Sequence, residues 1–172
     1  DGAVVVFCGV GGVEAQSETV WHQADSYNIP RIAVVNKMDR IGADFNRALK
    51  SMVDRLGARP VPLQIPVGAQ KDFDGVIDLI EMSWLRFDEK DDGRTVERAP
   101  VPDEFNEAAR AARENMLEKL AEFSDELMEK FLDGGEIPVG LVKDAVQKGT
   151  LLSRITPVLV ESALKKKGIQ PI

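Results

Sequence analysis

Runs of apolar, mostly β-branched residues constrain the fold of this chain more than any other feature of its sequence. Residues 3–7, 31–35 and 155–160 form three such runs. A continuous apolar run of this length is typical of a strand that is buried on both faces, as in a parallel sheet. Polar or glycine-containing segments follow each run and predict loops at the strand ends.

Helical patterns alternate with the first two strands. Residues 17–28 have helical spacing, and residues 45–56 form an amphipathic helix that Gly57 closes. The apolar side of the first helix is expected to carry Val20, Trp21, Ala24 and Tyr27. This alternation predicts an α/β fold with a doubly wound, mainly parallel sheet, in which ligands bind beyond the C-terminal ends of the strands.

The pattern changes after Gly57. Residues 61–67 alternate between apolar and other side chains, as expected for a half-exposed strand, and residues 76–87 predict one long strand. A charged turn at 88–93 and a return strand at 95–101 complete a predicted hairpin.

Three helices are predicted after this hairpin. A long helix opens at Pro102, Ser124 caps the next helix, and a third helix covers residues 139–148. We therefore expect an α/β domain made of residues 1–56 and 151–172, interrupted by an inserted α+β subdomain at residues 57–150.

Asn36, Lys37 and Asp39 follow the second strand directly, and their chemistry suits the recognition of guanine. Guanine presents two adjacent donors, N1–H and its exocyclic amine, and the carboxylate of Asp39 can accept from both. A base without this donor pair would leave the carboxylate unpaired, which is costly. The stem of Lys37 can lie on the base while its ammonium stays in water. Asn36 can tie the loop to its neighbours. The alternative interpretation of the whole segment is a polar loop that binds no ligand.

Ser162 and Ala163 follow the third strand and are candidates for a second guanine loop. A guanine site needs a backbone N–H from a neighbouring strand-end loop to meet the O6 acceptor of the base. Ala163 is the candidate for this N–H group, and Ser162 is expected to brace Asp39.

The chain resembles bacterial translation elongation factor G over essentially its whole length. The resemblance rests on residues 1–4, 12–21, 30–40, 42–45, 60–66 and 165–170. It implies the C-terminal part of a P-loop GTPase domain with the inserted subdomain of this family. Members use GTP hydrolysis to drive tRNA and mRNA movement through the ribosome, so GTP or GDP, with Mg²⁺, and the ribosome are the expected ligand and partner of the parent protein.

Carried over to this sequence, the resemblance assigns Asn36, Lys37 and Asp39 to base recognition and Ser162 and Ala163 to the second guanine loop. A ribosome-protection protein, a release-factor GTPase or an elongation factor G paralogue remains an alternative parent. One position departs from the family pattern, because Glu161 stands where the family usually has Gly before Ser-Ala.

The sequence lacks the motifs that hold and cleave the phosphates. It contains no G-x-x-x-x-G-K-[ST] segment, no switch threonine and no Asp-x-x-Gly-His segment. In the resembled family these lie upstream of the position of Asp1. His22, the single histidine, falls in the first predicted helix and is not expected to be catalytic. We therefore expect no catalytic residue, no metal ligand and no tightly bound nucleotide in this chain.

Glu118, Glu122 and Asp125 are spaced i, i+4 and i+7 and would share one face of a continuous helix. A solvated face is the usual explanation of such a run. The resemblance adds a second, because the inserted subdomain of elongation factor G is thought to meet the ribosomal stalk protein, whose partner surface is basic. The chain is thus interpreted either as part of a translational GTPase or as a self-sufficient stalk-docking module.

Charge and composition exclude other classes of protein. A net charge of −7 argues against a broad nucleic-acid-binding surface, so no direct nucleic-acid site is expected. No apolar run is long enough to span a bilayer, and no signal peptide is recognisable. The single Cys8 excludes an internal disulfide. These features predict a cytoplasmic protein.

Overall fold

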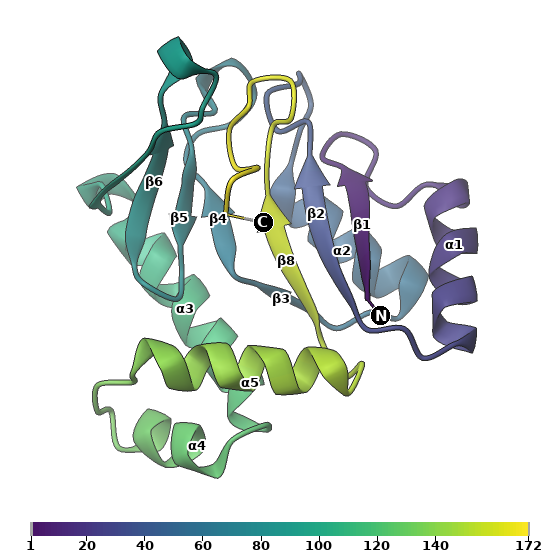
Figure 1. Cartoon of the computed structure of the whole chain (residues 1–172), viewed down its shortest axis with the longest axis vertical. Coiled ribbons are helices and arrows are strands. Elements are labelled where there is room, and N and C mark those ends of the chain that lie inside the picture. Colours follow the sequence, from purple (N-terminus) through teal and green to yellow (C-terminus); the bar gives the residue numbers. More distant parts are fainter. Residues whose placement is uncertain (1, 172) are drawn as a thin grey trace.

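The computed structural model describes residues 2–171, without the side chain of Glu89. Over these residues the strands form two four-stranded sheets that lie side by side (Figure 1). The first sheet is parallel. Its strands, in order across the sheet, are β1 (Ala3–Cys8), β2 (Arg31–Asn36), β8 (Thr156–Val160) and β3 (Pro60–Pro62).

The second sheet is antiparallel. Its strands, in order, are β4 (Gln64–Pro66), β5 (Val76–Asp78), β6 (Ser83–Phe87) and β7 (Val96–Pro100). The hairpin predicted around residues 88–93 is confirmed by the pairing of β6 with β7.

The chain changes sheets at Leu63, so the single strand predicted for residues 61–67 is wrong. The N–H group of Leu63 donates to Val158 of the first sheet at 2.9 Å, and its carbonyl accepts from Leu79 of the second sheet region at 2.9 Å. The long strand predicted for residues 76–87 is also wrong. It is two strands, because the Asp78 carboxylate accepts from the N–H group of Ile80 at 2.8 Å and closes a turn.

Five α-helices lie in the described part of the chain, at α1 (Ala15–Ser26), α2 (Phe45–Leu56), α3 (Asn106–Ala121), α4 (Asp125–Leu132) and α5 (Val139–Leu151). Short 3₁₀ turns cover η1 (Gln70–Asp72), η2 (Glu89–Asp91) and η3 (Asp103–Phe105). The predicted caps are confirmed, because the Ser124 side chain accepts from Leu127 and Gly57 has a left-handed conformation at the end of α2.

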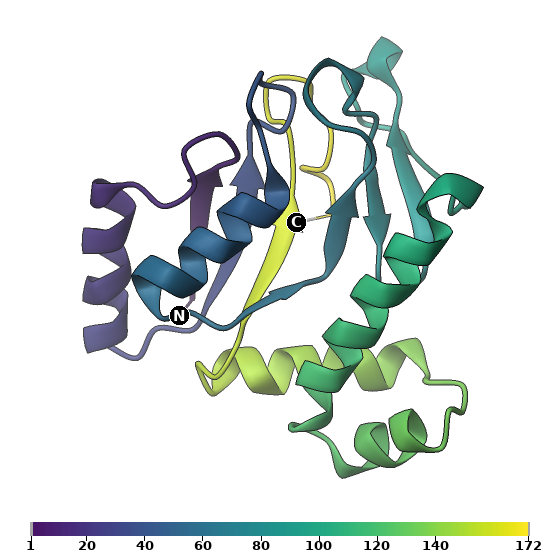
Figure 2. The same ribbon diagram turned by 180° about the vertical axis from the view of Figure 1, so that it is seen from behind.

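Helices lie on both sides of the first sheet. Figure 2 shows α2 in front of that sheet with α1 beside it, whereas Figure 1 shows α5 on the opposite side. The Trp21 ring of α1 packs on Phe7, with their centroids 6.0 Å apart, and on the guanidinium of Arg31. Val20 and Tyr27 of α1 are 51% and 78% exposed, so only part of the apolar side predicted for this helix is buried.

β1 is not buried on both faces, contrary to the prediction from its apolar run. Val4 and Val6 are 58% and 54% exposed, whereas Phe7 is 2% exposed. β1 pairs with β2 alone among the described strands, and α1 and α2 cover only one of its faces. A strand at the end of a sheet keeps an open face unless another element packs on it.

Two apolar clusters fill the molecule. One lies between the first sheet, α1 and α2, and it reaches Val76 and Leu85 of the second sheet. The other lies among α3, α4, α5 and the second sheet. β3 falls within the predicted insertion at 57–150 yet pairs with β8, so the boundary between sheets lies at Leu63. The division of the chain into 1–56 with 151–172 and 57–150 stays a prediction. Across residues 2–171 no helix has both the length and the apolar character needed to cross a membrane.

Candidate functional site

The predicted site residues come from two loops that end neighbouring strands. β2 and β8 pair in parallel, so their C-terminal ends lie at the same edge of the sheet (Figure 1). The segment after β2 carries Asn36, Lys37 and Asp39, and the segment after β8 carries Ser162 and Ala163. Strand order alone therefore places two segments together that are more than a hundred residues apart in the sequence.

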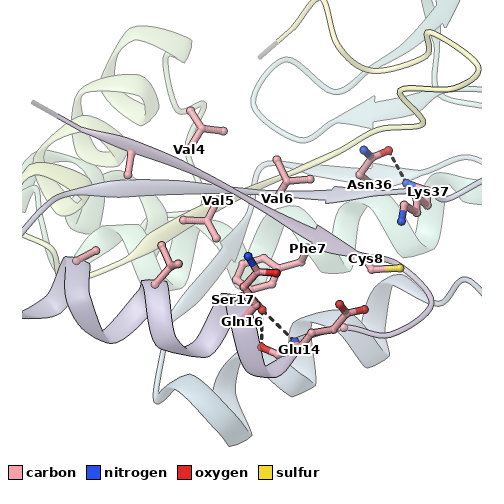
Figure 3. Close-up of a pocket in the computed structure, with 14 residues that line it drawn as sticks. Val4, Val5, Val6, Phe7, Cys8, Glu14, Gln16, Ser17, Asn36 and Lys37 are labelled. Atoms are coloured by element: carbon pink, nitrogen blue, oxygen red, sulfur yellow. Dashed lines mark hydrogen bonds between the residues drawn. The ribbon is translucent and has the colours of Figure 1, made fainter.

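The first loop is anchored by its apolar residue. Met38 is 1% exposed and packs in the core, and this leaves the Lys37 side chain exposed and Asp39 half-buried. Lys37 has a left-handed backbone with φ of 66°, and the Asn36 Oδ1 atom accepts its N–H group at 2.6 Å (Figure 3). Gly9 packs closely against this loop, because a Cβ atom there would lie 2.9 Å from Met38 Sδ and 3.1 Å from the Asn36 carbonyl oxygen.

Direct hydrogen bonds join the two loops. The Ser162 hydroxyl donates to Asp39 Oδ1 at 2.6 Å, which is the bracing contact expected from the sequence. The Ala163 N–H group donates to Asn36 Oδ1 at 3.0 Å. Ser162 is fully buried, whereas Ala163 is exposed. All five predicted residues thus belong to one connected group.

The bonding pattern determines what this group can offer to a ligand. A carboxylate has about four acceptor positions, so Asp39 retains acceptor capacity beside the bond from Ser162. The Lys37 side chain has no partner among the described residues and is exposed. The Ala163 N–H group is occupied by Asn36, so it meets a new acceptor only if the Asn36 side chain shares or releases it.

A cavity of about 430 Å³ runs along β1 and reaches the first of these loops (Figure 3). Val4, Val6 and Val20 line its apolar part, and Asn36 and Lys37 lie at one end. The cavity follows the open side of β1, so it belongs to the uncovered edge of the sheet as much as to the loops.

Comparison with known proteins decides the family. The family described as the elongation factor Tu GTP binding domain matches residues 1–172. The chain belongs to the elongation factor Tu GTP-binding domain family. It is 54% identical over all of its 172 residues to elongation factor G 2 of Desulfotalea psychrophila and 49% identical to elongation factor G of Thermotoga neapolitana. The chain spans 25% of the length of each of these relatives.

A solved structure agrees with this assignment at the level of the fold. A crystal structure of a protein from Thermus thermophilus superposes with a TM-score of 0.84 at 27% identity. The match covers 99% of this chain and 25% of that one. The α/β fold of the family, with its parallel sheet and a second antiparallel sheet, is therefore the fold of this chain.

Glu161 stands where the resemblance described above leads us to expect a glycine. Its backbone is not left-handed, so no glycine is required at this position. The close approach is made by Gly168 instead, where a Cβ atom would lie 2.3 Å from the Val160 carbonyl oxygen and 3.2 Å from Glu161 Cβ. Glu161 is 7% exposed, and burial raises the pKa of its carboxyl. The Glu161 side chain is therefore buried without strain in the backbone.

Sequence reasoning missed the residues that hold the two loops in place. Gln64 is 3% exposed, and its Oε1 atom accepts the Val160 N–H group at 3.1 Å. The Lys167 ammonium is buried and donates to the Phe73 carbonyl and to Asp74, each at 3.3 Å. Lys167 lies in the 165–170 stretch that carries the family resemblance, and no other feature of the sequence indicated its supporting role.

The predicted acidic face is not formed by one helix. α3 ends at Ala121 and α4 begins at Asp125, so the chain has no continuous helix that would place the three acidic residues on one face. Glu122 receives two hydrogen bonds from the Arg59 guanidinium, and the first of these, to Oε2, is 2.8 Å long. This contact lowers the pKa of Glu122 and raises that of Arg59. Glu118 and Asp125 are exposed, and no cluster of candidate metal ligands occurs within residues 2–171.

Proposed function

We propose that Asn36, Lys37, Asp39, Ser162 and Ala163 bind the guanine base of GTP or GDP. The observation that carries this proposal is the pair of cross-loop bonds, from Ser162 to Asp39 and from Ala163 to Asn36. These bonds orient a carboxylate, an amide and a backbone N–H group at the C-terminal edge of a parallel sheet, which is where ligands of such sheets bind.

The chemistry of guanine fits the groups that this edge presents. The Asp39 carboxylate accepts from N1–H and from the exocyclic amine, and the bond from Ser162 fixes its orientation. The stem of Lys37 covers one face of the base. Ala163 donates to O6 once Asn36 shares its N–H group, so base binding is coupled to a small movement of the Asn36 side chain.

We infer that the chain works within a longer cytoplasmic GTPase of translation. The relatives that it matches are named elongation factor G, and the chain covers about a quarter of each. Mg²⁺ and the groups that polarise the phosphates supply the hydrolytic chemistry, and in this proposal they come from residues outside this chain. Translocation on the ribosome is then the process that the base-binding edge serves.

Replacement of Asp39 with Asn tests the base assignment in the full-length protein. The carboxamide offers one acceptor and one donor in place of two acceptors, so GDP affinity should fall by about 100-fold or more. Affinity for xanthosine diphosphate, which has a carbonyl where guanine has its amine, should rise. Asp133→Asn is the control, because Asp133 is exposed at the end of α4. Unchanged GDP affinity in Asp39→Asn would exclude the assignment.

The 172-residue chain gives a second test. A base-reading loop without phosphate contacts lacks the charge-assisted bonds that dominate nucleotide affinity. Titration calorimetry of this chain with GDP should therefore detect very weak binding or none. Micromolar binding would show that the base contacts alone hold the nucleotide.

Docking of a basic partner such as the ribosomal stalk protein is a second proposal for this chain. Exposed Glu118 and Asp125 support it, whereas Glu122 is already bonded to Arg59. The informative variant is therefore Glu118→Lys with Asp125→Lys, which leaves the Arg59 pair intact. Association with the isolated stalk protein should slow and lose salt dependence. Glu104→Lys with Glu107→Lys is the charge-matched control. Unchanged association in the first double variant would exclude the docking proposal.

A further inference from the structure

The loop between β4 and β5 meets both candidate guanine loops, although it contains none of the predicted site residues. This 67–75 loop lies at the same end of the molecule as the loop that follows β8 (Figures 1 and 2). The N–H group of Gln70 donates to the Met38 carbonyl of the first guanine loop at 2.9 Å. On its other side, Phe73 and Asp74 receive the Lys167 ammonium.

The 67–75 loop is itself tightly closed. The N–H group of Val67 donates to the Gly75 carbonyl and that of Asp74 donates to the Val67 carbonyl, both at 2.9 Å. Gly68 has φ of 71°, and a Cβ atom there would lie 2.0 Å from the Asp72 carbonyl oxygen. These hydrogen bonds and the close approach at Gly68 restrict the backbone conformations of the loop.

Three of the segments that meet here contain a non-glycine residue in the left-handed region. These residues are Lys37, Gln70 and Lys166, with φ of 66°, 59° and 54°. Such a conformation costs free energy and persists where surrounding contacts enforce it. Gln70 itself bonds to the first guanine loop. Lys37 and Lys166 are the neighbours of Met38 and Lys167, which bond between loops. The three segments therefore hold one another in place.

A continuous chain of contacts leads from the 67–75 loop to the carboxylate that would read the base. Asp74 and the Phe73 carbonyl accept from the buried Lys167 ammonium. The backbone of Lys167 pairs in both directions with Ser162, through N–H to carbonyl bonds of 2.8 and 3.1 Å. The Ser162 hydroxyl donates to Asp39 at 2.6 Å.

We propose that Lys167 and Asp74 are positioning residues for guanine recognition, through which the 67–75 loop fixes the Asp39 carboxylate by way of Ser162. This inference rests on the proposed base-binding function. It assigns to the second sheet a role in base selectivity, because the loop that carries Asp74 joins two of its strands.

Nucleotide selectivity in the full-length protein is the first measurement. Inosine diphosphate lacks the exocyclic amine of guanine, so the ratio of GDP to inosine diphosphate affinity reports how well the Asp39 carboxylate is placed. Lys167→Met should lower GDP affinity by about tenfold and bring this ratio close to one, because one charged contact that orients the site is lost. Asp74→Asn should lower the ratio less, because the Phe73 carbonyl still receives the ammonium.

Matched controls come from the same two loops. Lys165→Met changes an exposed neighbour of Lys167, and Asp72→Asn changes an exposed neighbour of Asp74. Both should keep the wild-type ratio. Loss of overall stability alone would lower the amount of folded protein without changing the ratio. A wild-type ratio in folded Lys167→Met would overturn the proposal.

Amide hydrogen exchange in the 172-residue chain without nucleotide separates this inference from the proposed function. Lys167→Met and Asp74→Asn should both speed exchange at the Ser162 and Met38 amides, while the amides of α2 keep their protection. If the full-length protein bound no guanine nucleotide, the proposed function would fail and the exchange rates would still test the link between loops. Unchanged exchange at Ser162 in both variants would overturn that link.

Discussion

The two faces of the parallel sheet are made from the same strands and the same kinds of residue, but they are buried to very different degrees. On the face that α1 and α2 cover, Phe7 and Val35 are 2% and 0% exposed. On the opposite face of β1, Val4 and Val6 are 58% and 54% exposed. An apolar run therefore shows that a strand can be buried, and the neighbouring elements decide which of its side chains are.

Burial on the second face changes across the sheet. Val34 of β2 and Leu159 of β8 are 1% and 8% exposed, and α5 lies on this side of the sheet (Figure 1). β1 lies at the far end of the sheet and has no such cover among the described residues. The open area is thus a property of one edge strand.

Truncation of one side chain on each face of β1 should give the largest difference. Phe7→Ala should lower the free energy of unfolding by about 3–5 kcal/mol, because it leaves a cavity among Trp21 and the strands. Val6→Ala should lower it by less than about 1 kcal/mol, because the side chain is more than half exposed. Urea unfolding of both variants measures this, and equal losses would mean that the second face is buried in solution.

Removal of the cation that fastens α1 to the covered face should have the next largest effect. The Arg31 guanidinium is buried, lies 4.4 Å from the Trp21 ring centroid, donates to the Trp21 carbonyl and pairs with Asp25 at 2.8 Å. Arg31→Met should lower the free energy of unfolding by about 2 kcal/mol. Arg94→Met, at an exposed position of the hairpin, should have no measurable effect in the same assay.

A smaller, pH-dependent effect on stability is expected at Glu161, the residue that directly follows β8. Burial raises the pKa of Glu161 in the folded state, so ionisation of this carboxyl opposes folding. The penalty is absent below the ordinary pKa of about 4.3 and complete above the raised pKa. Glu161→Gln should therefore increase thermal stability at neutral pH, and the gain should disappear below about pH 4. A gain that is constant with pH would exclude ionisation as its cause.

Polar replacement on the open face should have the smallest effect on stability. Val4→Thr with Val6→Thr keeps the β-branched shape, so the free energy of unfolding should change by less than about 1 kcal/mol. The replacement removes exposed apolar area, and it should reduce self-association of the 172-residue chain in sedimentation velocity. If association were unchanged, contacts between molecules would have to lie elsewhere.

Much of the site could be predicted because it depends on local order and on one rule of topology. A buried strand followed by Asn36, Lys37 and Asp39 is visible in the sequence, and so is a second strand followed by Ser162 and Ala163. Parallel neighbours end at the same edge, so the two loops meet. The supporting contacts could not be predicted, because Lys167 and Asp74 are 93 residues apart and no periodic pattern connects them.

The errors in the fold have a common cause. Strict alternation over residues 61–67 fits one strand, but Leu63 bonds to both sheets and divides it. The turn that Asp78 closes divides the strand predicted at 76–87. In each case a hydrogen bond to a distant or neighbouring backbone group overrode the apolar pattern, which records burial and not pairing.

The sequence by itself indicated the family resemblance, three of the four strands of the parallel sheet with the helices α1 and α2, and the candidate base-binding residues. Those properties follow from local periodicity and from side-chain chemistry at strand ends. Only the tertiary structure decided that one face of β1 stays open, that Glu161 is buried without a strained backbone, and that a loop of the second sheet bonds to both candidate guanine loops. The physical reason is that burial and cross-loop hydrogen bonds depend on which segments become neighbours, and no single segment encodes its neighbours.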